Sequence, residues 1–377
     1  MKKFIIVGVL SIFTYPLFAQ VEIVLSNSSE MQRHEVVELS DSELAKKLLS
    51  DSMVICDAFG VDQPYQISHD GKVLLYASVR PYGKAVYKVE KGLPVHSKGR
   101  TYVSGRFYAE RADDISFEND RAGFRIYGPA TQKRGERSYG IDLWVKHSSE
   151  LLVDSLYRLG FSRRLNYHLD YGLGMDPYGV GPTLGCGTPA LMVGDSICYP
   201  WCYEKYEILD NGPLRFTLRL DFAPVKMGDD MVTEHRLMQL DRGSNFCKTT
   251  VWYEGITRPV SLASGLAVRV ADTTSVMMDK NYIHYADPTM EPERYNSQIF
   301  TALIFPDGVD EVRRQMFDEP MGANAGHALG IVRNYTGQPY TYYLGMAWSD
   351  LDVRSQEEWQ IRIQHFLQCL RQGLGQM

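Results

Sequence analysis

Short runs that alternate between apolar and polar residues recur along the whole chain, and they predict a mainly β protein. An Asp70-Gly71 pair between two β-rich runs is a strong hairpin signal. One short helix is expected over 41–50, with Asp41 or Ser42 as its N-cap. Residues 20–107 are therefore expected to form a small N-terminal β-domain. Its first strands are expected over 21–27, 34–40 and 52–60.

From about Tyr108 the β-type runs become longer and carry polar loops between them. Many strands at short spacing favour a large antiparallel β-sandwich. The chain closes with an amphipathic helix that begins near Ser355. We expect residues 108–377 to form one sandwich domain with this helix packed on it. The apolar stripe of the helix consists of Trp359, Ile363, Phe366 and Leu370.

The stretch YHLDYGLGMDPYGVG, residues 167–181, has neither a helical stripe nor strand alternation. It predicts a loop that extends to about Gly194. Glycine allows positive φ and close approach of a ligand to the backbone, so such loops often carry function. The same residues would also suit a tight, hydrogen-bonded turn.

The first residues have the pattern of a secretory signal peptide, residues 1–19. Lys2 and Lys3 precede an apolar run, and Ala19 stands at a plausible cleavage position. Because no cysteine follows that position, a lipid anchor is not expected, and the protein is expected to be periplasmic or secreted. No later apolar run is long enough for an integral membrane segment.

Composition narrows the classes of partner. The net charge is −6 without a basic stripe, which argues against nucleic acid. Tyrosine occurs 24 times, which suits binding to sugar rings and equally suits β-sheet packing. Cys198 and Cys202 could form a local disulfide or remain free thiols. The sequence does not indicate the oligomeric state.

Six stretches share one family pattern: AERADDISFENDRAGFRIYGPA, GIDLWVK, YHLDYGLGMDPYGVG, LGCG, DNGPLRFTLRLDF and GMAWSD. Together they resemble a family of exported bacterial proteins known as a domain of unknown function. The resemblance covers most of residues 21–370, and the glycine loop and the stretch from Glu118 to Ala130 are its most specific parts. It implies a galactose-mutarotase-like super-sandwich. It also implies an association with enzymes that dismantle uronate-containing, pectin-like glycans. It supplies no catalytic residues.

Chemistry on a uronic acid suggests candidate residues. In β-elimination a base removes the C5 proton, which is acidic only when the sugar carboxylate is neutralised. Arg121 and Arg125, on one face of an expected strand, could clamp the carboxylate, or could form surface ion pairs with Glu118 and Asp120. His168 could act as the base. Tyr171 and Tyr178 could act as acid or base.

Two other chemistries use the same loop. Hydrolysis needs two carboxyl groups about 5–10 Å apart. Asp170 and Asp176 are candidates, and Glu118 or Asp120 could complete a pair. A divalent cation could be held by His168, Asp170 and Asp176, although the spacing matches no known loop motif. No other cofactor is expected. Further candidates for contact with the substrate, each of which could equally be a packed structural residue, are His235, His327, Trp348 and Tyr285.

The sequence therefore predicts an exported carbohydrate-active protein, a lyase or glycosidase that acts on uronic-acid-containing oligosaccharides. The alternative is a glycan-binding protein without catalytic activity.

Overall fold

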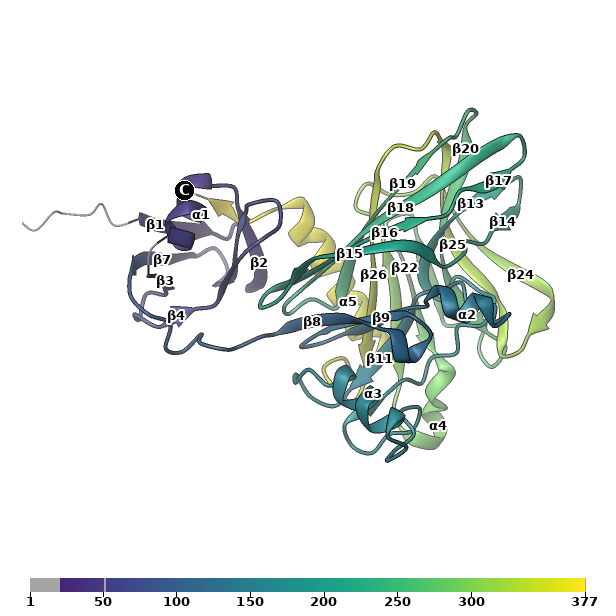
Figure 1. Cartoon of the computed structure of the whole chain (residues 1–377), viewed down its shortest axis with the longest axis horizontal. Coiled ribbons are helices and arrows are strands. Elements are labelled where there is room, and N and C mark those ends of the chain that lie inside the picture. The colour runs from purple at the N-terminus through teal and green to yellow at the C-terminus, as the bar shows by residue number, and fades with distance from the viewer. Residues whose placement is uncertain (1–20, 51, 377) are drawn as a thin grey trace, which may run out of the picture.

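The computed structural model describes residues 21–50 and 52–376, so the expected signal peptide lies outside the described residues. The protein is mainly β, with a small N-terminal β unit, a large antiparallel sandwich and a C-terminal helix, which confirms the expected fold class (Figure 1). No helix among the described residues is both long and apolar enough to cross a membrane.

The N-terminal unit consists of two small sheets around their own apolar core. Helix α1 (Ser42–Ser50) begins where Asp41 accepts hydrogen bonds from the backbone N–H groups of Glu43 and Leu44, so Asp41 is the cap. The five-stranded sheet has the order β27 (Gly375–Gln376), β1 (Val21–Ser26), β7 (Lys84–Lys91), β3 (Met53–Cys56) and β4 (Asp62–Gln63). The three-stranded sheet has the order β2 (Arg33–Leu39), β6 (Val73–Val79) and β5 (Tyr65–Ile67).

A nine-stranded sheet forms the centre of the sandwich. Along most of its strands one face carries large apolar side chains that belong to the main core. Its order is β15 (Tyr203–Asn211), β16 (Arg215–Phe222), β18 (Asp230–Asp241), β19 (Phe246–Glu254), β26 (Tyr340–Trp348), β23 (Ile299–Ile304), β22 (Tyr282–Asp287) and β21 (Val276–Asp279), with β17 (Val225–Met227) paired to β18.

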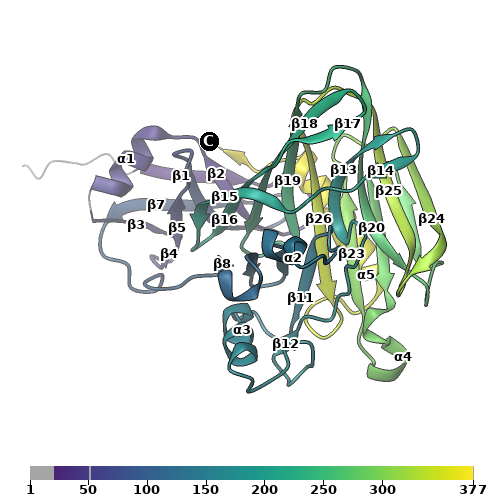
Figure 2. The ribbon, with the colours of Figure 1, turned by 45° about the vertical axis from the view of Figure 1, so that its right-hand side comes forward.

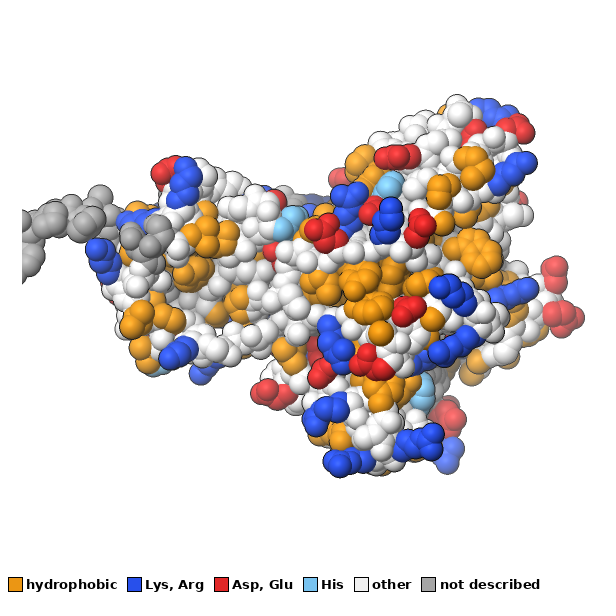
Figure 3. All heavy atoms as spheres, in the orientation of Figure 1, with side chains coloured by type: hydrophobic (Ala, Val, Ile, Leu, Met, Phe, Trp, Pro, Cys, Tyr) orange, Lys and Arg blue, Asp and Glu red, His pale blue; other side chains and the backbone are white. Residues whose placement is uncertain are grey.

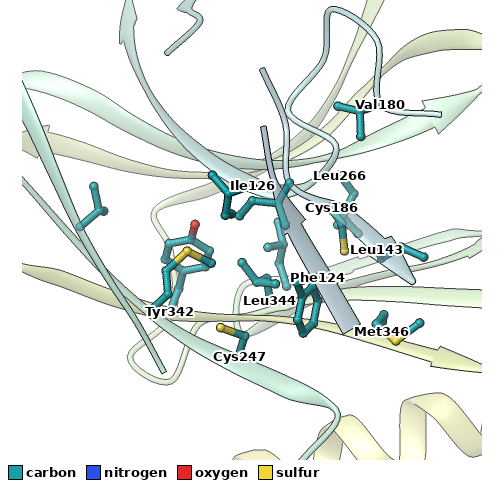
Figure 4. Close-up of a cluster of buried hydrophobic side chains, with 14 of the residues drawn as sticks. Phe124, Ile126, Leu143, Val180, Cys186, Cys247, Leu266, Tyr342, Leu344 and Met346 are labelled. Carbon is teal, nitrogen blue, oxygen red and sulfur yellow. The ribbon is translucent and has the colours of Figure 1, made fainter. Parts of the chain in front are cut away.

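Two five-stranded sheets pack on that face (Figure 2). Phe124 and Leu143 from one of them meet Leu344 and Met346 of the large sheet in the buried cluster of Figure 4. The first sheet has the order β12 (Gly174–Met175), β11 (Asp142–Lys146), β10 (Gly123–Ile126), β9 (Asp114–Asn119) and β8 (Val103–Tyr108). The second has the order β14 (Ser196–Cys198), β13 (Cys186–Val193), β20 (Val260–Arg269), β25 (Asn324–Tyr335) and β24 (Glu311–Met321).

The opposite face of the large sheet is covered by α5 (Gln356–Arg371), which buries Trp359, Ile363 and Leu367. The expected packing of the closing helix on the sandwich is confirmed. Ser355 caps this helix by accepting a hydrogen bond from the backbone N–H of Glu358. The shorter helices are α2 (Pro129–Lys133), α3 (Val153–Phe161) and α4 (Pro292–Tyr295), and 3₁₀ turns cover Ala109–Arg111 and Pro288–Met290.

Polar contacts join the N-terminal unit to the sandwich. The amide of Gln66 bonds to the backbone of Leu214 and Arg215. The Arg215 guanidinium lies 2.5 Å from Glu38 and 2.6 Å from Asp241. After α5 the chain returns to the first unit, where β27 pairs with β1.

Two local predictions are wrong. Residues 186–193 form β13, a central strand, and not part of a loop to Gly194. The sequence pattern does not indicate this strand, because a strand buried on both faces shows no alternation and this one contains glycine and proline. Arg121 lies in the turn between β9 and β10, so it does not share a strand face with Arg125.

Candidate functional site

Helix α3 supports a polar groove beside the predicted loop. Its residues Leu156 and Tyr157 pack against Trp144 of β11. At its start, the backbone N–H groups of Leu152 and Val153 donate to one oxygen of Glu118, at 2.7 and 2.6 Å. Lys146 lies 2.9 Å from the other oxygen of that buried carboxylate. Glu118 therefore anchors the helix and is not exposed to a substrate.

The end of α3 contains an unusual backbone conformation. Arg163 has a φ of +56°, in the left-handed region that glycine normally occupies at a helix C-terminus. Its N–H donates to the carbonyl of Gly160, and the N–H of Arg164 donates to that of Leu159. A non-glycine residue in this region costs about 1 kcal/mol or more, and such residues cluster at functional sites.

A groove of about 570 Å³ follows this helix end. It has no acidic side chain in its lining. In the described part of the chain no carboxylate pairs with Arg163 or Arg164. Figure 3 shows Lys and Arg side chains gathered at the end of the molecule where Figure 1 labels α3. The lining residues are Gly160, Arg163, Arg164, Leu165, Asn166, Tyr167, His168 and Tyr171.

His168 has a defined orientation in this groove. Its Nδ1 atom lies 2.9 Å from the backbone oxygen of Asp176 and 3.4 Å from the Asp176 carboxylate. Because a carbonyl oxygen can only accept, Nδ1 carries the hydrogen, and in the neutral ring Nε2 is left with the lone pair. The side chain is 52% exposed, so this nitrogen can receive a proton from a bound molecule.

Beneath His168 lies a buried cluster of charges. Arg125 lies between Asp142 and Asp176, and the Arg125–Asp176 ion pair measures 2.8 Å. Tyr127 donates a 2.6 Å hydrogen bond to Asp142. Burial raises the pKa of Asp176 to about 8, with the Asp142 charge adding to the rise and Arg125 opposing it. One guanidinium thus lies between two buried carboxyl groups, and burial favours the protonated form of Asp176.

A second acid extends this cluster. Asp114 lies 4.0 Å from Arg125 and 3.7 Å from Arg111. Burial raises its pKa to about 6 against the pull of these arginines. Arg111 also donates to the hydroxyl of Tyr167, at 3.0 Å, so the cluster fixes the start of the loop.

The predicted loop residues separate into two groups. His168 and Tyr171 line the groove, with Asp176 and Arg125 below them. Asp170 instead lies 2.7 Å from His147 and accepts the backbone N–H of Gly172, so it holds a turn. Burial raises the pKa of Asp170, but the hydrogen bonds from His147, Gly172 and Gly174 and the charge of His147 together outweigh it, so the net pKa is lowered.

The remaining candidates do not reach the groove, which corrects the expectation of one cleft. Tyr178 is buried under the guanidinium of Arg269, 4.3 Å from its ring centre. Arg121 pairs with Asp352. Trp348, Tyr285 and His327 are core residues. Each has an apolar or ring-containing side chain that the sandwich core requires.

The other two histidines have structural partners. His235 stacks on Trp252 and lies 2.5 Å from Asp221 on the outer face of β18. His327 accepts the N–H of Leu184, and burial lowers its pKa to about 4, so it stays neutral.

A cation site does not form from the expected residues. Asp170 bonds to His147, whereas Asp176 contacts His168 and Arg125. Within residues 21–50 and 52–376 there is no group of three or more His, Cys, Asp or Glu side chains arranged to hold a metal ion. Cys198 and Cys202 are free thiols.

Sequence reasoning missed the two arginines of the groove. The signal was present, because Val153, Leu156 and Tyr157 have the spacing of a helical stripe. A helix ending near residue 161 would have placed Arg163 and Arg164 immediately before the glycine loop.

Comparisons with known proteins agree with this architecture. A family model described as "Domain of unknown function (DUF4861)" matches residues 25–374. Uncharacterized protein P7 of Formosa agariphila is 29% identical over 295 residues, which is 76% of this chain and 72% of that protein.

Two solved structures share the fold. An alpha-mannosidase from Enterococcus faecalis V583 is similar over 91% of this chain and 45% of its own, with a TM-score of 0.50 and 11% identity. A protein in the Glycosyl Hydrolase Family 38 from Enterococcus faecalis is similar over 91% and 46%, with a TM-score of 0.50 and 10% identity. The chain thus spans less than half the length of these structures.

Proposed function

Because the chain belongs to the family described as a domain of unknown function (DUF4861), we propose its function from the groove itself: it binds uronic-acid-containing oligosaccharides there and cleaves them by β-elimination. The observation that carries the proposal is the presence of two arginines without acidic partners beside a histidine of fixed orientation. Arginine forks bind carboxylates in two-point geometry. The fold is shared with proteins titled as an alpha-mannosidase and a glycosyl hydrolase, which supports a carbohydrate ligand.

The proposed reaction uses the groove residues in separate roles. Arg163 and Arg164 neutralise the sugar carboxylate, which makes the C5 proton acidic. Nε2 of His168 takes that proton, and Tyr171 protonates the oxygen that leaves C4. The C5–H and C4–O bonds break, and a C4–C5 double bond forms. Hydrolysis by paired carboxyl groups is disfavoured because no Asp or Glu lines the groove.

Binding without catalysis is the second candidate. Its support is the openness of the site, since the side chain of His168 is 52% exposed and Tyr171 is 55% exposed. Electrostatic catalysis is stronger in a site that excludes water. Export to the periplasm or beyond remains part of the proposal and rests on the sequence of residues 1–19.

One incubation distinguishes the candidates. Pectic and arabinogalactan-type oligosaccharides are mixed with the protein, and the ultraviolet absorbance of unsaturated uronates is followed together with new reducing ends. A lyase produces both signals, and a hydrolase produces reducing ends alone. A binding protein produces neither but shows heat of binding in calorimetry. Equal response to uronate-free oligosaccharides contradicts the uronate proposal.

A further inference from the structure

A second cavity lies at the end of the sandwich, away from α3. Its volume is about 170 Å³, and the segment between β14 and β15 forms one wall. Figure 3 shows hydrophobic side chains on the visible face near where Figure 1 labels β14 and β17. The lining residues are Leu191, Cys198, Tyr199, Pro200, Trp201, Phe222, Ala223, Val225, Lys226, Met227, Val232, Glu234 and Tyr253.

The walls of this cavity are aromatic. Trp201 is 59% exposed, although large apolar side chains are normally covered in this sandwich. Tyr199 and Phe222 line the same cavity. An exposed indole beside other rings offers a flat apolar surface, whose burial by a ligand is favourable.

One lining residue is a buried carboxylate, Glu234, only 8% exposed. One of its oxygens accepts a 3.0 Å hydrogen bond from the hydroxyl of Tyr253, and the other accepts a hydrogen bond from Nε of Arg236. Each carboxylate oxygen has two lone pairs, so each can accept one more hydrogen bond. The buried Nη2 of Arg236 has no hydrogen-bond partner among the described residues.

The charges of Glu234 and Arg236 limit the class of ligand that this cavity can bind. Arg236 already neutralises Glu234, and Lys226 adds positive charge to the lining. A cation would therefore gain little electrostatic stabilisation by binding here. An ionised carboxylate on a ligand offers only acceptors, so it cannot donate to the free lone pairs of Glu234. A purely apolar molecule would remove water from Glu234 without replacing its hydrogen bonds, which is costly. A ligand that combines an apolar face with hydroxyl donors satisfies both the rings and the carboxylate.

We infer that this cavity is a binding site for a neutral pyranose ring, which stacks on Trp201 and donates hydroxyl hydrogen bonds to Glu234. The inference goes beyond the proposed function and does not depend on it, because no residue of the α3 groove takes part.

Calorimetric titration and saturation-transfer NMR with methyl glycosides of glucose, galactose, mannose and rhamnose test the site, with methyl glucuronide as the anionic probe. Trp201→Ala is the decisive variant, because an exposed side chain can be removed without unfolding the sandwich. Phe59→Ala removes another exposed ring, on the N-terminal unit, and serves as its matched control. Glu234→Gln tests the carboxylate, and the melting temperature of each variant is checked first.

We expect at least one neutral glycoside to bind and Trp201→Ala to weaken it by about tenfold or more, which corresponds to about 1.4 kcal/mol. Phe59→Ala and His168→Ala leave that affinity unchanged. The inference is overturned when no neutral glycoside binds at millimolar concentration. It is also overturned when Trp201→Ala binds like the wild type, or when methyl glucuronide is the preferred ligand of the Trp201 site.

Discussion

His168 and Asp176 are joined by a 2.9 Å hydrogen bond from the ring Nδ1 to the backbone oxygen, with the Asp176 carboxylate 3.4 Å from the same nitrogen. A half-exposed histidine is thus oriented by a buried acid. The acid in turn belongs to the Arg125 cluster, so the position of the loop depends on residues from two strands of the sheet below it.

His168→Ala tests whether the groove is catalytic. For a lyase we expect kcat to fall by about 10²–10⁴-fold with little change in binding, because the variant loses proton transfer. Stopped or continuous ultraviolet assays give kcat, and calorimetry gives the binding constant. His34→Ala, at an exposed histidine of the N-terminal unit, is the control. Unchanged turnover in a folded His168→Ala protein would assign the loop to recognition.

Arg163→Gly tests why an arginine occupies a left-handed position. Glycine adopts this φ without the Cβ penalty, so we expect the free energy of unfolding to rise by roughly 0.5–1 kcal/mol. Affinity for uronate oligosaccharides should fall, since one half of the clamp is lost. Asn296→Gly, also at positive φ, should leave that affinity intact. Urea unfolding and calorimetry measure the two effects, and retained affinity would remove Arg163 from the site.

Arg164→Lys tests two-point recognition separately. Lysine keeps the charge but loses the planar fork, so affinity for oligosaccharides with a free carboxylate should drop. Methyl-esterified oligosaccharides should bind wild type and variant alike. Equal loss on both ligands would mean that Arg164 supports the fold of the loop and not the carboxylate.

The raised pKa of Asp176 predicts that the stability of the protein depends on pH. Its folded pKa, about 8, lies above the unfolded value, so the native state holds a proton that the unfolded state releases. This stabilisation is complete below about pH 4 and is lost as pH rises to about 8. Asp176→Asn keeps the side chain neutral at every pH. The free energy of unfolding of the variant, relative to that of the wild type, should therefore increase as pH rises from 5 to 8. Urea titrations at several pH values measure the difference, and parallel curves would contradict the prediction.

Glu118→Gln should destabilise the protein by about 3–5 kcal/mol, because it leaves the buried Lys146 without a counter-charge and weakens the cap of α3. Hydrogen exchange should speed up most in α3. Glu150→Gln, at an exposed position nearby, should change neither stability nor exchange. A stable Glu118→Gln protein would show that the helix is fixed by packing alone.

The sequence predicted the strands with clear alternation, Asp41 as one of two candidate caps, and the closing helix, because each depends on local spacing. It also indicated the loop that carries His168 and Tyr171, both of which line the groove, since a glycine-rich polar loop is visible without tertiary information. It did not separate Asp176 and Tyr178 from their neighbours, although both are buried. Asp176 is buried against Arg125 of β10 and Tyr178 against Arg269 of β20, and no local pattern encodes these contacts between distant elements. The position of Arg121 differs from the prediction because a tight turn between β9 and β10 interrupts an apparently continuous alternation.

The pairing of β27 with β1 sets an order for biosynthesis. The first sheet lacks this edge strand until residues 375–376 have left the ribosome, by which time the sandwich strands are all available to fold. Arg33 likewise gains its contacts with the carbonyls of Cys369 and Gln372 only then. The N-terminal unit is therefore translated first but completed last, and a nascent chain that stalls before α5 exposes an open strand edge.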